Sequence, residues 1–116
     1  MRYALLGYGP PDGMDSMSED ERATWDADDA AFNKMLAGRG CVVFGIPLAE
    51  PTTATTVRLR DGQPVLTDGP FAETSEVLGG ILVIEVADLD EALDIARQCP
   101  AARLGPLEVR PIPERE

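Results

Sequence analysis

TDGPFAET, residues Thr67–Thr74, is the stretch that decides the fold, because it places a tight turn between two segments that are typical of β-strands. Asp-Gly-Pro favours a turn, since glycine adopts backbone conformations that other residues avoid and proline cannot join the ladder of a central strand. Before it, residues 63–67 form the second arm of a hairpin whose turn is Asp61-Gly62. After it, the nearly continuous apolar run Ile81–Val86 predicts a central strand.

Outward from this centre, capping signals and periodicity predict the other elements. Ser18 and Glu21 have the Ser-x-x-Glu spacing of a capping box, which predicts a helix from there to about Ala37. Asp88–Glu91 has a similar arrangement and starts a second helix, which Pro100 ends. The predicted elements are, in order, a strand at 3–8, a helix at 18–37, a strand at 41–48, hairpin arms at 55–60 and 63–67, a strand at 81–86, a helix at 89–99 and a strand at 107–112.

Each predicted helix carries an apolar stripe at helical spacing, which indicates packing against a sheet. The stripes are Trp25, Phe32 and Leu36 in the first helix, and Leu89, Ala92, Leu93 and Ala96 in the second.

With the extra hairpin arm set aside, the order of elements predicts a split βαβ, ferredoxin-like α+β fold in one domain, residues 1–116. Two helices cover only one face of such a sheet. Val57, Leu59 and half of the residues of Ile81–Val86 would leave a large apolar area exposed on the other side. We therefore expect a homodimer.

The charge balance and the absence of histidine exclude several functions. The chain has 10 basic and 21 acidic residues, a net charge of −11. Such a surface repels phosphates, so neither nucleic acid nor an anionic membrane is an expected partner. No histidine is present, which excludes Ser-His-Asp and Cys-His catalysis and His-ligated zinc. Acid–base chemistry would fall to carboxylates, tyrosines, lysine or thiols.

Neither a disulfide, a metal, a cofactor nor a membrane helix is expected. Cys41 opens an apolar run and Cys99 ends a helical pattern, so both are predicted to be small core residues. Asp26, Asp28 and Asp29 lack the spacing of a calcium loop and indicate a solvated helix face. No stretch approaches the roughly 18 apolar residues of a membrane helix, and the first residues are unlike a signal peptide. A cytoplasmic location is the expectation.

Several linked motifs, in one order, resemble the DGPF group of YCII-related proteins over nearly the whole chain. They are Thr56-Val57-Arg58, Asp61-Gly62, the TDGPFAET string, Gly79-Gly80, Leu89-Asp90-Glu91-Ala92 and Glu108-Val109-Arg110-Pro111. The resemblance implies a ferredoxin-like fold that pairs as a dimeric α/β barrel, and it implies no particular activity. Ser75 departs from the lysine of many relatives. The His–Asp pair discussed for broader YCII relatives does not transfer, because this chain has no histidine.

Five charged residues make up the candidate ligand-binding site: Arg58, Asp68, Glu73, Glu76 and Arg110. The hairpin, the Asp-Gly-Pro-Phe turn and the last strand are expected to converge near one end of the sheet. A partly dry cleft of arginines and carboxylates would bind a small polar molecule through charge-assisted hydrogen bonds. Asp68 or Glu73 would serve as a general base if burial raised its pKa, and Asp68 is the catalytic candidate.

Other interpretations of these residues stay open. Asp68 suits a tight turn, in which its carboxylate accepts backbone N–H groups while Phe71 seats the loop on the core. The two arginines would then pair with the two glutamates on the surface. A non-catalytic accessory or regulatory protein, with acidic helices suited to a basic partner, is the alternative function. A carboxylate-based enzyme of unknown reaction is a further one.

Overall fold

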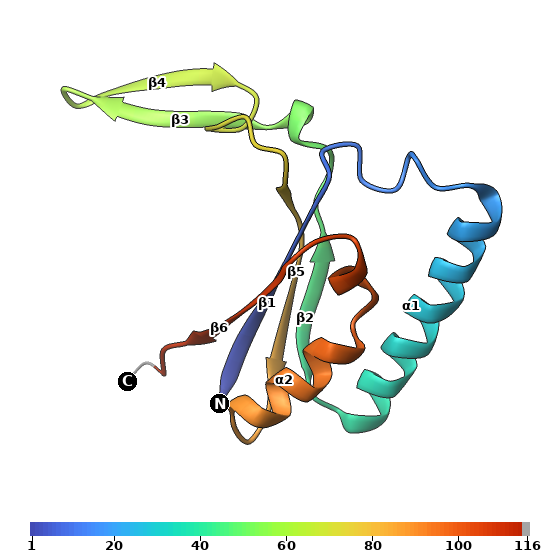
Figure 1. Cartoon of the computed structure of the whole chain (residues 1–116). Coiled ribbons are helices and arrows are strands. Elements are labelled where there is room, and N and C mark those ends of the chain that lie inside the picture. The colour runs from blue at the N-terminus through green and yellow to red at the C-terminus, as the bar shows by residue number, and fades with distance from the viewer. Residues whose placement is uncertain (115–116) are drawn as a thin grey trace.

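The computed structural model describes residues 1–114 and has the predicted order of helices and strands (Figure 1). The elements are β1 (Arg2–Gly9), α1 (Glu19–Arg39), β2 (Val42–Pro47), β3 (Thr55–Arg60), β4 (Gln63–Asp68), β5 (Val77–Glu85), α2 (Leu89–Gln98) and β6 (Leu107–Ile112). Two short 3-10 helices, η1 (Pro51–Thr53) and η2 (Pro100–Arg103), lie in the connections. The apolar central strand begins at Val77, earlier than the apolar run alone indicates.

Four strands form an antiparallel sheet in the order β2-β5-β1-β6. The two central strands come from the two halves of the chain, and each βα unit adds its second strand at an edge. This confirms the α+β architecture with two helices, and it is compatible with a ferredoxin-like fold.

Local signals at the helix ends act largely as predicted. Ser18 Oγ accepts a hydrogen bond from Glu21 N (3.1 Å) and Glu21 Oε1 accepts one from Ser18 N (3.0 Å), which completes the capping box of α1. Gly40, at φ 64°, ends this helix in the left-handed conformation that glycine adopts most easily. The second capping box is incomplete, because the carboxylate of Glu91 accepts from Ala87 N rather than from the cap residue Asp88.

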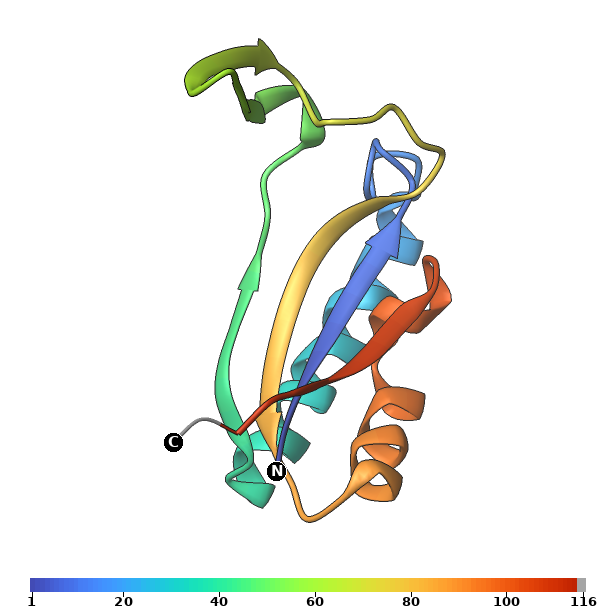
Figure 2. The same cartoon turned by 90° about the vertical axis from the view of Figure 1, so that its left-hand side faces the viewer.

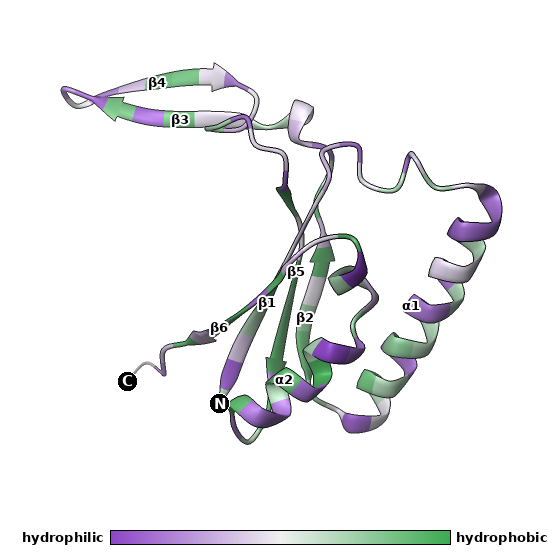
Figure 3. Cartoon of the chain, in the orientation of Figure 1, coloured by the Kyte–Doolittle hydropathy of each residue, from purple (hydrophilic) through white to green (hydrophobic). Residues whose placement is uncertain are grey.

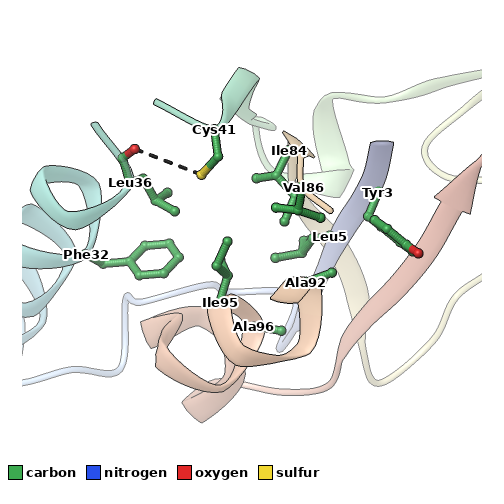
Figure 4. Packing of buried hydrophobic residues seen from close by; sticks show 10 residues of the cluster. All are labelled: Tyr3, Leu5, Phe32, Leu36, Cys41, Ile84, Val86, Ala92, Ile95 and Ala96. Carbon is green, nitrogen blue, oxygen red and sulfur yellow. Dashed lines mark hydrogen bonds between the residues drawn. The ribbon is translucent and has the colours of Figure 1, made fainter. Parts of the chain in front are cut away.

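The core lies between one face of the sheet and the two helices (Figure 4). Leu5 and Ile84 reach it from the central strands, and Leu36 and Ile95 reach it from the helices; all four are at most 2% exposed. Cys41 is buried there, as predicted.

Two predicted members of the helical stripes lie outside this core. Trp25 is only partly buried, with the Arg103 guanidinium 5.5 Å from its ring centroid, and Leu89 is 47% exposed. The spacing rule over-extends both stripes, because only the part of a helix that touches the sheet buries its apolar side.

Both helices lie on the same side of the four-stranded sheet, and the other side is uncovered (Figures 1 and 2). In antiparallel strands, directly opposed side chains project from the same face. The strand register therefore defines an open face, made of Ala4, Leu6, Phe44, Ile46, Ile81 and Val83. On the edge strand, Phe44 and Ile46 are each 47% exposed, whereas Val83 on the central strand β5 is only 5% exposed. The hydrophobic colouring along β2 and β5 is visible in Figure 3.

β3 and β4 pair as the hairpin that the Asp61-Gly62 signal predicts. They form a two-stranded sheet of their own, so the expectation that Val57 and Leu59 belong to the uncovered face of the main sheet is wrong. Both turn residues have positive φ, 50° and 78°, which is typical of the two-residue turn that suits the strand twist. The hairpin extends past the end of the main sheet, on the side toward which the open face looks (Figure 1). The radius of gyration is accordingly 16.4 Å, whereas a compact chain of this length would have about 13 Å.

The hairpin has two chemically different faces. We call one the apolar hairpin face; it consists of Val57, Leu59, Pro64 and Leu66, with Thr55 and Asp68 at its base. The polar hairpin face consists of Thr56, Arg58, Arg60, Gln63, Val65 and Thr67. The predicted separation of Val57 and Leu59 from the arginines of β3 is confirmed.

Candidate functional site

The Asp-Gly-Pro-Phe turn is tied to the beginning of the hairpin by glycine and threonine. Gly69 has φ 91°, and its N–H donates a 2.7 Å hydrogen bond to the Ala54 carbonyl oxygen. The Thr56 hydroxyl donates a 2.8 Å hydrogen bond to the Gly69 carbonyl oxygen. These bonds position the end of β4, and none of the side-chain hydrogen bonds found in residues 1–114 involves the Asp68 carboxylate. Asp68 is exposed and available to another group.

Phe71 does not act as the predicted plug of the loop. Its side chain is 77% exposed, so the prediction that it seats the turn on the core is wrong for the single chain. Arg58 reaches toward this segment and donates through Nη2 to the Phe71 carbonyl oxygen at 3.5 Å. That distance is long for a hydrogen bond, and it leaves most of the guanidinium donors free.

Arg58 and Asp68 leave the hairpin on opposite faces. Asp68 lies directly opposite Thr55 and therefore belongs to the apolar hairpin face, whereas Arg58 lies opposite Val65 on the polar one. Within one chain, then, the hairpin separates these two predicted site residues.

Glu73 and Glu76 lie in the segment that returns from the hairpin to the sheet. Glu73 is exposed. The Thr74 hydroxyl donates a 2.5 Å hydrogen bond to the Glu76 carbonyl oxygen, which fixes the entry into β5. The Glu76 carboxylate lies beside Gly105, since a Cβ added to Gly105 would stand 3.0 Å from Glu76 Oε2 and would collide with the Tyr8 carbonyl oxygen.

Arg110 forms a polar cluster with two residues that the sequence did not single out together. Its Nη2 donates a 2.7 Å hydrogen bond to Glu108 Oε2, and the Tyr8 hydroxyl donates to Glu108 Oε1 at 3.5 Å. The hydrogen bond to Glu108 and its negative charge raise the pKa of Arg110. We call Tyr8, Glu108 and Arg110 the polar cluster. Arg110 thus pairs with Glu108 rather than with Glu73 or Glu76.

The polar cluster borders the open face. Glu108 lies opposite Leu6 and Arg110 lies opposite Ala4, so both project on the side that the helices leave uncovered. Strand alternation within 107–112 puts Glu108 and Arg110 on the same face, and that signal was readable from the sequence. The contribution of Tyr8 was not readable, because it depends on which strand lies beside the last one.

The predicted site residues therefore fall into two groups. Arg58, Asp68 and Glu73 belong to the hairpin and its return segment. Glu76, the last residue before β5, lies beside Gly105 at the end of the main sheet, and Arg110 lies in β6. Among residues 1–114, no ion pair joins one group to the other.

The thiols contribute no nucleophile to either group. Burial raises the pKa of the Cys99 thiol, so this side chain stays protonated near neutral pH. Cys41 is buried and points at the Leu36 carbonyl oxygen, 4.0 Å from its Sγ. Within residues 1–114, no three Cys, Asp or Glu side chains gather as metal ligands do, and no helix is both long and apolar enough to cross a membrane.

Fold and site together define a small α+β protein with one sheet face open and a polar cluster at its border. A family described as the YCII-related domain matches residues 1–115. An uncharacterised protein of Rhizobium meliloti is 40% identical over 117 residues, which cover 97% of this chain and 92% of that protein. The chain belongs to the YCII-related family.

The fold is similar to that of a solved structure over nearly the whole chain. That structure is the 5-chloro-2-hydroxyhydroquinone dehydrochlorinase TftG of Burkholderia phenoliruptrix, in complex with 2,5-dihydroxybenzoquinone. The TM-score is 0.54 at 15% identity, and the match covers 99% of this chain and 96% of that one. At such an identity the likeness concerns the fold alone.

Proposed function

We propose that this protein is a homodimer of the DGPF group that binds a small polar molecule where its arginines and carboxylates meet the covered open face. The observation that carries the proposal is the position of the polar cluster, Tyr8, Glu108 and Arg110, at the border of an apolar sheet face. Removing an ion pair from water costs about as much free energy as the pair returns, so the Arg110–Glu108 pair at the border of an interface is better explained by ligand binding than by a gain in stability.

The proposed dimer is supported by the uncovered side of the sheet. A helix or sheet normally buries its apolar face against another layer, and here the open face has no second layer within the chain. The dimeric α/β barrel that the DGPF resemblance implies would supply that layer by pairing two open faces. Such a contact would use the same surface on both copies, as two-fold symmetric dimers do.

The polar cluster offers both donors and acceptors to a ligand. Arg110 has five N–H groups and uses one of its nitrogens on Glu108, so other donors are free for a carbonyl or carboxylate oxygen. Each Glu108 oxygen accepts one hydrogen bond and retains a lone pair for an N–H or O–H group of the ligand. This chemistry favours a molecule that carries an acceptor and a donor side by side.

Residues of the hairpin and of its return segment would complete the site. Asp68 is the proposed base, Arg58 and Glu73 are proposed charged contacts, and Glu76 would act at the sheet end beside Tyr8. Asp68 has no hydrogen-bond partner among the side-chain bonds of residues 1–114, which leaves its oxygens free for a ligand proton.

A thermal-shift screen of a metabolite library tests the proposal, with Arg110→Gln as the site variant and Arg22→Gln as the matched control. Arg22 forms an exposed ion pair on α1, away from the open face. A true ligand should raise the melting temperature of the wild type and of the control, and should lose most of this effect in Arg110→Gln. A ligand that stabilises all three proteins equally would place its binding elsewhere and refute the proposed site.

A regulatory or accessory role is the second candidate, and the exposed acidic first turn of α1 favours it. Glu19, Asp20 and Glu21 stand together there, at the far end of the helix from the sheet contact. Binding to a basic protein that weakens with added salt, and that an α1 charge-reversal variant abolishes, would support this role.

A further inference from the structure

The apolar hairpin face is the most exposed apolar surface of the described chain. Leu59 is 74%, Leu66 68% and Val57 59% exposed, although all three project from the same side of the hairpin. A two-stranded hairpin by itself is marginally stable in water, and a contiguous exposed apolar surface marks an interaction site. We therefore expect the apolar hairpin face to be buried against another surface.

The position of the hairpin indicates which surface packs against its apolar face. It projects on the side toward which the open face looks (Figures 1 and 2), so any layer that covers the open face meets the hairpin. We infer that the hairpin of each protomer reaches over the second copy and packs its apolar face on that copy. The inference rests on the proposed dimer and adds to it a second contact, which two-fold symmetry makes twice.

A second copy fits this surface better than an unrelated partner does, because one segment supplies both halves of the contact. Among residues 1–114, every exposed large apolar side chain except Met1 and Leu89 lies between Val42 and Phe71. The segment contains the hairpin and also β2, an edge strand whose residues are all exposed. β2 of one copy is thus the matching apolar surface for the hairpin of the other.

Charge also favours self-association through this segment. The whole chain has a net charge of −11, so two copies repel each other over most of their surface. The segment from Val42 to Phe71 has only Glu50, Asp61 and Asp68 against Arg58 and Arg60. A contact through this segment brings together two nearly neutral surfaces. It also keeps the acidic α1 helices of the two protomers apart.

The contact has a consequence for the candidate base. Asp68 stands at the base of the apolar hairpin face, beside Val57 and Leu66. Covering that face would bring groups of the second copy beside the Asp68 carboxylate, whereas Arg58 projects from the opposite, polar hairpin face. The site that contains Asp68 is therefore incomplete in one chain and is finished by the second copy.

Two neighbouring residues of β4 provide a matched test. Leu66 belongs to the apolar hairpin face and Val65 to the polar one, so Leu66→Glu and Val65→Glu add the same charge to opposite sides. Sedimentation velocity over a concentration series measures the dimer dissociation constant. Leu66→Glu should raise it on the order of 30-fold or more, as loss of an interface hot spot does, while Val65→Glu should change it little.

Phe44→Glu, on the open face, separates this inference from the proposed dimer. Dissociation by Phe44→Glu together with an unchanged Leu66→Glu dimer would overturn the hairpin contact and leave the dimer standing. A monomeric wild type would overturn both. Equal weakening by Leu66→Glu and Val65→Glu would refute the assignment of faces.

Amide hydrogen exchange of the wild type provides a readout without mutation. Hairpin amides in residues 55–68 should exchange more slowly as dimer forms with rising concentration, because the contact holds the hairpin closed. Exchange that stays fast in a fully dimeric sample would overturn the inference. Far-UV circular dichroism of each variant checks that the main sheet, which contains neither β4 residue, remains folded.

Discussion

The Tyr8 hydroxyl donates a hydrogen bond to Glu108 Oε1 across two antiparallel strands, at 3.5 Å. Leu6 is directly opposite Glu108, so Tyr8 is its diagonal neighbour on the same face. Arg110 holds the other carboxylate oxygen at 2.7 Å. A single carboxylate thus organises a phenol and a guanidinium beside an apolar face, and the proposed ligand site depends on this arrangement.

Tyr8→Phe should weaken ligand binding and leave the stability of the fold almost unchanged. The hydroxyl bond is at the long limit for a hydrogen bond, so its loss should change the unfolding free energy by no more than about 1 kcal/mol. The melting-temperature shift caused by a ligand from the screen should fall, because the phenol no longer orients Glu108. An unchanged ligand shift would show that Tyr8 has no part in binding.

Gly69→Ala should loosen the Asp-Gly-Pro-Phe turn. The φ of Gly69 is 91°, and a Cβ in a left-handed conformation costs about 1–2 kcal/mol. Faster amide exchange in β3 and β4 is the expected readout, since this turn ties the hairpin through Ala54. Gly38→Ala, at a helical position with open space around it, is the control and should stabilise the chain by about 0.5–1 kcal/mol. Unaltered hairpin exchange in Gly69→Ala would contradict the assigned role of the turn.

Gly105→Ala should destabilise the junction between β1 and β6. The added Cβ would collide with the Tyr8 carbonyl oxygen and would stand 3.0 Å from Glu76 Oε2. Forcing extra volume into a closed space costs about 1–3 kcal/mol, measured as the change in the urea midpoint. Gly79→Ala, whose nearest contact would be 3.9 Å away, is the matched control. Similar losses in both variants would refute close packing at Gly105.

The capping box of α1 should make the stability of the protein depend on pH in the acid range. Hydrogen bonds from the backbone and side chain of Ser18 lower the pKa of Glu21 from its ordinary value of 4.5. A lowered folded-state pKa stabilises the protein above the ordinary value, and the gain disappears as pH falls through the folded-state pKa.

Urea unfolding at a series of pH values measures this effect. The stability difference between wild type and Glu21→Gln should be largest near neutral pH and should vanish in acid. Glu19→Gln is the control, because Glu19 is in the same helical turn but outside the capping box. A Glu21→Gln difference that does not vary with pH would contradict the capping role of the carboxylate.

The order of elements followed from signals that act between residues close in the chain. Ser18 caps α1, Asp61-Gly62 turns the hairpin, and alternation along β3 separates Val57 from Arg58. The same two-residue turn also sets the register that places Asp68 opposite Thr55. The opposite orientations of Asp68 and Arg58 were therefore available from the sequence.

The sequence by itself determined the helices, the strands, the hairpin with its two faces and the lack of histidine chemistry, because each depends on local conformation or composition. The tertiary structure decided that Arg110 pairs with Glu108 beside Tyr8, that Glu76 lies against Gly105 and that Phe71 is exposed. These contacts join residues that strand pairing brings together from distant parts of the chain. Which strands become neighbours is settled by the burial of the whole core, and no short stretch of sequence contains that information.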